Sequence, residues 1–197
     1  MRYAKLRNIK SLYFGYEEIA RSLGIGMASA RVSANRYVKQ GMLIRAKRNI
    51  YILRDRWEAL GDADKFALAN ITQAPSYISL MTAMGYHGVT TQIQRNFIES
   101  IALKRTKEIR VGEDTLRYVK VDKKLYFGFI RKNNFFIATP EKALLDAVYL
   151  KSLGRYDFDI TSVDFGKING PAVKGMIGKF PKRTKELLYG SGYTKRA

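Results

Sequence analysis

The first fifty-six residues place apolar side chains at the spacing of three short helices followed by a β-hairpin. Apolar positions recur every three or four residues over 3–11, 16–23 and 27–40, which predicts a helix in each range. Glycines at 24 and 26 supply a turn between the second helix and the third. Two apolar stretches, 42–46 and 49–53, then predict strands joined by a basic tip. This order of elements is typical of a winged helix-turn-helix, in which the hairpin is the wing.

The remainder of the chain predicts a second domain of mixed α+β type. A polar connector over 54–63 precedes two helices, 64–70 and 75–86, and Pro75 stands at the first position of the second. The period then shifts toward two, which predicts strands over 97–103, 115–121, 125–130 and 134–137, most simply in an antiparallel sheet. Thr139 caps a helix over 140–150, and one or two short helices follow near the end. We therefore expect an N-terminal domain over 1–56 and a C-terminal domain over 57–197.

Positive charge is concentrated at the two ends of the sequence. The formal net charge is +19 and the pI is near 10.1. Residues 1–56 carry thirteen Lys and Arg against three acidic residues, a net +10, whereas 57–164 carry only +2 and 165–197 carry +7. Such an excess favours a polyanionic partner. A winged domain can also bind protein, but that role needs no such excess of cations, so double-stranded DNA is the expected partner.

The third helix and the hairpin tip provide the side chains expected to contact DNA. Small residues near the start of a recognition helix let its backbone approach the major groove, and basic or amide side chains reach base edges and phosphates. A basic wing suits the minor groove or the phosphates. The predicted contacts are Ser29, Arg31, Ser33, Asn35 and Arg36 on the helix and Lys47, Arg48 and Asn49 at the tip.

A second basic group follows residue 164. It presents either a solvated surface, a second DNA contact or a docking surface for an acidic partner. Its members are Lys167, Lys174, Lys179, Lys182, Arg183 and Lys185.

The sequence offers no set of residues for catalysis. There is no cysteine, and His87 is the only histidine, so thiolate sites and two-histidine mechanisms are excluded. Glu141 and Asp146 lie five positions apart on different helix faces, where capping and surface solvation explain them. We expect no enzyme, no metal and no cofactor. With no long apolar run, a soluble, cytoplasmic protein without a membrane partner is expected.

Three segments give the chain a family resemblance over nearly its whole length. They are the wing end Arg48-Asn49-Ile50-Tyr51, the segment 74–80 with Tyr86-His87-Gly88, and the segment 138–146, which reads ATPEKALLD. With these segments the chain resembles the AbiEi-type antitoxins, which are transcriptional regulators of bacterial type IV toxin–antitoxin (abortive infection, phage defence) systems. Asn49 is a departure, because the family more often has glycine there, although asparagine accepts the same backbone conformation.

The resemblance implies an autoregulatory repressor. Its N-terminal domain would bind inverted repeats in its own promoter, and its C-terminal domain would counter a nucleotidyltransferase-like toxin without a stable complex. It implies no catalytic residue in this chain.

Two other functions stay open at this point. An RNA- or ribosome-associated protein would use basic ends with stacking Tyr and Phe residues. An enzyme acting on nucleic acid is the third, and a requirement for a divalent metal would favour it.

Overall fold

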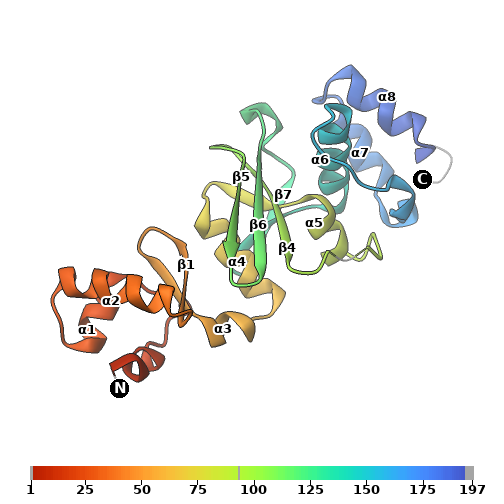
Figure 1. Ribbon diagram of the computed structural model, residues 1–197. Helices are drawn as coiled ribbons and strands as arrows, with labels where there is room; N and C mark the ends of the chain where they lie inside the picture. The colour runs from red at the N-terminus through yellow and green to blue at the C-terminus, as the bar shows by residue number, and fades with distance from the viewer. Residues whose placement is uncertain (1, 93, 194–197) are drawn as a thin grey trace. The chain divides into compact units, whose positions relative to one another are not determined.

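The computed structural model describes residues 2–92 and 94–193, which form two compact units (Figure 1). Unit 1 comprises Met1–Lys65 with Ile109–Asp114, and unit 2 comprises Phe66–Glu108 with Thr115–Ala197. Both units contain helices and strands, so the chain is an α+β protein, as predicted. Unit 1 extends past residue 56 and includes a segment from much later in the chain.

Unit 1 is built from short helices and one hairpin. Its elements are the 3-10 helix η1 (Arg2–Asn8), α1 (Tyr16–Leu23), α2 (Met27–Lys39), β1 (Leu43–Lys47), β2 (Ile50–Leu53) and α3 (Arg54–Glu58). Figure 1 shows α1 beside α2, with the hairpin following α2. Leu6, Ile19, Ala30 and Tyr51, all fully buried, bring η1, α1, α2 and β2 into one core. The helices at 16–23 and 27–40 and the hairpin are thus confirmed within a residue or so.

Two predictions for unit 1 are wrong. The first helix is a 3-10 helix that ends at Asn8. The second error concerns residues 54–63, expected to be a polar connector, which contain the helix α3. Trp57 in this helix is 1% exposed, and its indole Nε1 donates to Asp114 at 2.8 Å. Lys65 also pairs with Asp114, at 2.9 Å, and Gly112 lies against the indole. The partner of Trp57 is remote in sequence, so no local pattern indicates it.

The rest of the chain contains a six-stranded sheet with helices. The elements are α4 (Asp62–Thr72), β3 (Ser76–Ile78), α5 (Leu80–Tyr86), β4 (Phe97–Ala102), β5 (Lys107–Val111), β6 (Asp114–Lys120), the 3-10 helix η2 (Lys123–Leu125), β7 (Phe129–Lys132), β8 (Phe135–Ala138), α6 (Pro140–Ser152), the 3-10 helices η3 (Ile160–Ser162) and η4 (Phe165–Lys167), α7 (Gly170–Ile177) and α8 (Lys182–Gly190). The strand order is β5-β6-β4-β3-β8-β7. Helix α6 packs against α5, α7 and α8.

The sheet is mixed, so the prediction of an antiparallel sheet is wrong. Strand β4 pairs in parallel with β6, and β3 pairs in parallel with β8, whereas β3–β4 and β7–β8 are antiparallel. Strand β5 occupies the connection between β4 and β6, which lets β6 return in the direction of β4. Strands β3 and β5 were not predicted. Residues 75–79 lie in and around a short, fully buried strand instead of a helix that begins at Pro75.

Helix α6 begins as predicted. The Thr139 hydroxyl accepts from the backbone N–H of Lys142 at 3.3 Å, and Pro140 stands in the first turn. The interpretation of Asp146 as a solvated surface residue is wrong, because its side chain is fully buried. Glu141 is also largely buried, and its Oε1 accepts from the backbone N–H of Asn169 at 3.1 Å.

Asp146 belongs to a buried polar cluster in unit 2. Its carboxylate forms an ion pair with Lys142 and accepts from the hydroxyls of Tyr77, at 3.0 Å, and Ser79, at 2.8 Å. Lys142 is fully buried too and also donates to Tyr77 Oη at 2.9 Å. These four residues lie within two of the three segments that carry the family resemblance, so the resemblance there reflects an internal structural element.

A second buried carboxylate makes the stability of the protein depend on pH. Glu99 is fully buried; Oε2 accepts from Tyr156 Oη at 2.7 Å and the Met81 N–H at 3.2 Å, while Oε1 has no hydrogen-bond partner among the described residues. Arg117 Nη1 lies 3.8 Å from Oε1. Burial raises the pKa of Glu99 from about 4.5 to about 7, although the bond from Tyr156 and the charge of Arg117 oppose the rise.

Because the folded protein holds this proton more tightly than the unfolded chain, the contribution of Glu99 to stability is complete below about pH 4.5 and is lost as the pH rises through 7. We expect its part of the unfolding free energy to fall by at most about 1.4 kcal/mol per pH unit over this window. Urea denaturation at several pH values, with Glu99→Gln for comparison, measures this slope. The variant should give a flatter profile, and equal slopes for both proteins would contradict the assignment.

Candidate nucleic-acid interface

Helix α2 turns most of the predicted contact residues toward solvent. Its other side is fixed by Ala30 and Ala34, both fully buried. Among the predicted helix contacts, four are exposed and one is half-buried. The exposed residues are Ser29, Arg31, Asn35 and Arg36, and the half-buried one is Ser33.

The two arginines lie on opposite flanks of the exposed surface of α2. Five residues of an α-helix correspond to a rotation of about 140°. Burial raises the pKa of Tyr51 on β2 to about 12, and the charges of Arg45 and Arg31 oppose this rise. The Arg36 guanidinium lies 5.3 Å from the ring centre of Tyr37, on the other flank. The exposed face of α2 therefore has a cation at each margin.

The centre of that face is apolar, which the sequence analysis did not consider. Val32 is 68% exposed, whereas Met27, 51% exposed in the first turn, is about 140° away around the helix and does not belong to this centre. Because Val32 is exposed, it does not contribute to the hydrophobic core of unit 1. A branched apolar side chain at this position suits the methyl group of thymine in the major groove. A search limited to polar residues missed Val32, although the helical repeat places it opposite Ala30 and Ala34.

The hairpin carries exposed cations on β1 and at its turn. Lys47 and Arg48 are exposed, as predicted for a basic tip. Arg45 on β1 is exposed as well; it lies opposite Tyr51, whereas Lys47 lies opposite Ile50 after a shift in the strand register. The prediction omitted Arg45, although strand alternation indicates it.

Asn49 has a structural role in the hairpin. Its φ of 61° is the left-handed conformation expected of asparagine at this position. Its side-chain Oδ1 accepts from the backbone N–H of Tyr16 at 2.7 Å, at the start of α1. A Cβ atom on Gly15 would lie 2.9 Å from this amide, so glycine leaves the space that Asn49 needs. The asparagine therefore holds the hairpin against α1.

Several other cations of unit 1 also serve the fold. Arg54 Nε donates to the Gly41 carbonyl at 2.6 Å and Arg56 Nη2 donates to the Ile9 carbonyl at 2.9 Å, whereas Arg7 pairs with Asp55 at 2.8 Å at the surface, where its side chain is 62% exposed. Part of the positive charge of residues 1–56 is therefore engaged in contacts within the fold and is not available to a partner.

The C-terminal basic group is divided among η4, α7, α8 and the turn between α7 and α8 in unit 2. Lys167 donates to the Gly88 carbonyl at 2.9 Å, Lys179 lies over the Phe127 ring at 4.2 Å, and Lys182 pairs with Glu186 at 3.6 Å. All are exposed except Lys185, which is half-buried: Lys167, Lys174, Lys179, Lys182, Arg183 and Lys185. Half of the group therefore has intramolecular contacts, and no single helix presents all six.

The described part of the chain contains no cluster typical of a metal site. Among residues 2–92 and 94–193, no three His, Cys, Asp or Glu side chains are grouped to hold an ion. Nε2 of His87 lies 2.9 Å from the Ala138 carbonyl, which gives it a structural partner. No helix within the same ranges has both the length and the apolar character to cross a membrane.

Comparisons with known proteins show a fold and no family. No family model matches the chain, and no curated protein matches it. Among solved structures, the Rv2827c protein from Mycobacterium tuberculosis is similar, with a TM-score of 0.63 and 13% sequence identity. The match covers 98% of this chain and 77% of the other. At this identity the likeness extends to the arrangement of helices and strands, and it assigns no activity.

Proposed function

We propose that unit 1 is a winged helix-turn-helix that binds double-stranded DNA, with α2 in the major groove and the β1–β2 hairpin as the wing. The observation that carries the proposal is the solvent-facing side of α2, which combines two flanking arginines with small and apolar side chains and is followed by a basic hairpin. A helix in the major groove needs this combination. An interface with another protein would not require cations on both flanks of α2 and along the hairpin.

Each part of this surface has a proposed role. Arg31 and Arg36 contact guanine edges or phosphates at the two margins of the groove, and Val32 contacts thymine methyl groups. The exposed Arg45 and Arg48 neutralise phosphates or enter the minor groove. Asn49 positions the wing through its bond to Tyr16 and is not a contact in this proposal.

We further propose, from the family resemblance, that the protein is an autoregulatory repressor and antitoxin of a type IV toxin–antitoxin system in the cytoplasm. The segments that resemble the family in unit 2 are mostly buried around Lys142 and Asp146, so the antitoxin role would depend on other, exposed residues. A growth assay tests this role. Expression of the full chain should restore growth of cells that produce the nucleotidyltransferase-like toxin, and continued arrest would contradict the proposal.

RNA binding is the alternative to DNA binding. Four aromatic rings of unit 1, those of Phe14, Tyr37, Tyr51 and Trp57, are buried and cannot stack on bases, which favours the duplex, whereas Tyr3 and Tyr16 are half-buried and Tyr13 is 39% exposed. A competition at fixed salt distinguishes the two partners. Labelled duplex from upstream of the gene should be displaced by the same unlabelled duplex at far lower concentration than by unrelated RNA. Displacement by RNA at equal or lower concentration would favour the alternative.

A further inference from the structure

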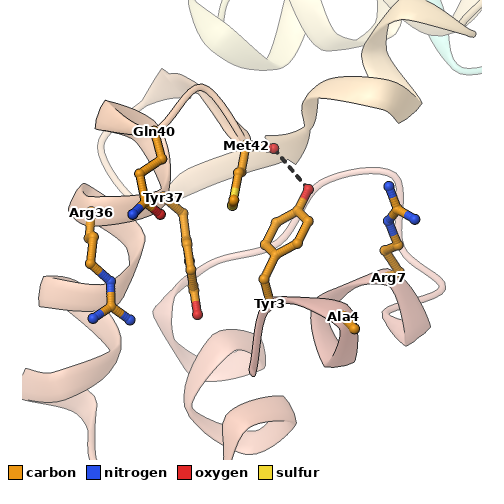
Figure 2. Close-up of a pocket in the computed structure, with 7 residues that line it drawn as sticks. All are labelled: Tyr3, Ala4, Arg7, Arg36, Tyr37, Gln40 and Met42. Atoms are coloured by element: carbon orange, nitrogen blue, oxygen red, sulfur yellow. Dashed lines mark hydrogen bonds between the residues drawn. The ribbon is translucent and has the colours of Figure 1, made fainter. Parts of the chain in front are cut away.

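A groove lies beside the proposed DNA-binding face, between η1 and the C-terminal half of α2 (Figure 2). Its volume is about 560 Å³, which is within the range of small-molecule sites. All of its lining residues belong to unit 1. The groove has no part in the proposed contacts except that Arg36 is common to both.

Two tyrosine rings pack against each other in the lining of the groove, and of these Tyr3 is half-buried whereas Tyr37 is only 5% exposed. The ring centres of Tyr3 and Tyr37 lie 5.4 Å apart with 59° between the ring planes. The Tyr3 hydroxyl donates to the Met42 carbonyl at 3.0 Å, which fixes this ring, and the Met42 side chain is 38% exposed at the rim. The accessible part of Tyr3, together with Met42, offers apolar contact to the face of a flat ring.

Two guanidinium groups border the tyrosines. Figure 2 shows Arg36 beyond Tyr37 and Arg7 beyond Tyr3, so that the cations stand at opposite ends of the aromatic pair. None of the described residues that line the groove is a carboxylate, and Asp55, which pairs with Arg7 at 2.8 Å, is not among them. Gln40 adds an amide that can donate and accept. The lining therefore combines apolar ring contact, positive charge and an amide that can hydrogen-bond a base edge.

We propose that this groove binds a free nucleotide, whose base lies against Tyr3 and Met42 and whose phosphate is held by Arg7 or Arg36. Planar guanidinium groups bind phosphate in a bidentate manner. Because Arg36 also belongs to the face proposed to bind DNA, a nucleotide in the groove competes for that arginine and weakens DNA binding. By linkage, DNA weakens nucleotide binding by the same factor. This regulatory part rests on the proposed function, whereas the groove itself does not.

Calorimetry with adenosine 5′-monophosphate and the full chain tests the site. We expect one saturable site, with adenosine and inorganic phosphate each binding much more weakly. Arg7→Gln and Arg36→Gln should each weaken binding of the nucleotide about tenfold, by loss of a charge-assisted contact. Arg7 is 62% exposed in its side chain, so its replacement leaves the core intact. Arg31→Gln, on the other flank of α2, is the matched control and should bind the nucleotide normally.

The coupling is tested separately by titrating the nucleotide into the protein–duplex complex. Release of the duplex by adenosine 5′-monophosphate, but not by the same concentration of phosphate, supports the proposal, and Arg7→Gln should need about ten times more nucleotide for release. Nucleotide affinity no greater than that of phosphate, or equal affinity in all three variants, would overturn the site. Tighter binding of a short single-stranded oligonucleotide than of the mononucleotide would also overturn it. Failure of the duplex to bind without any nucleotide would instead contradict the proposed function and leave the calorimetric result standing.

Discussion

Lys142→Met is expected to lower the free energy of unfolding by about 3–5 kcal/mol, because it leaves the Asp146 carboxylate buried without its counter-charge. Both side chains are fully buried, with 0% of their surface accessible to solvent. The hydroxyls of Tyr77 and Ser79 still donate to the carboxylate in the variant, but they do not neutralise it. Urea denaturation followed by far-UV circular dichroism measures the loss.

Two further variants separate the lost ion pair from other effects. Lys174→Met removes an exposed lysine from α7 and should change the unfolding free energy by less than about 0.5 kcal/mol. Adding Asp146→Leu to Lys142→Met removes the unpaired charge and should recover part of the stability. A stability of Lys142→Met equal to that of the control would show that the pair contributes nothing.

Replacing Arg31 and Arg36 together by glutamine is expected to weaken binding to the upstream duplex by about 2–6 kcal/mol, since each base-edge contact contributes about 1–3 kcal/mol. Both side chains are exposed on α2, and neither has an ion-pair partner in the described structure. Gel-shift titration of the full chain measures the affinity. Where an arginine contacts only phosphate, the loss should be equal for all duplexes and the salt dependence should become shallower.

The matched control removes the same charge elsewhere. Lys123 and Lys124 are exposed in η2 of unit 2, and their double replacement by glutamine should leave affinity for the duplex nearly unchanged. Equal losses in the two double variants would mean that net charge, and not the face of α2, determines binding.

The elements that the sequence predicts well have local signals that tertiary structure does not override. Helix α1 ends in a glycine with φ of 64°, and α6 has Thr139 and Pro140 at its start, so their boundaries are encoded within a few residues. Strand β3 has no such signal, because all three of its residues are buried and no alternation marks it. The direction of paired strands depends on the path of the intervening chain, which a periodic pattern does not contain.

The candidate site is predictable in its chemistry and less so in its individual residues. Helical spacing correctly separates Ala30 and Ala34 from Arg31 and Arg36. A charge count does not show that Arg54 holds the Gly41 carbonyl, since such a bond depends on the folded backbone. The same limit explains Asn49, whose partner Tyr16 is thirty-three positions away in the sequence.

The buried polar cluster of unit 2 is another feature that the sequence pattern does not predict. A helix containing Lys142 and Asp146 has the composition of a partly solvated helix, yet both residues are fully buried. Their burial depends on Tyr77 and Ser79, which come from a strand that the sequence pattern does not predict and the residue after it.

Sequence-specific binding of duplex DNA is tested most directly by titrating the full chain onto the duplex upstream of its gene and onto a scrambled duplex of equal length, over a series of salt concentrations. The intact chain is required, because unit 1 includes Ile109–Asp114 and buries Trp57 against Asp114. We predict a preference for the upstream duplex of at least about a thousandfold that persists as both affinities fall with salt. Equal affinity for the two duplexes at every salt concentration would contradict a recognition helix and leave only a nonspecific cationic surface.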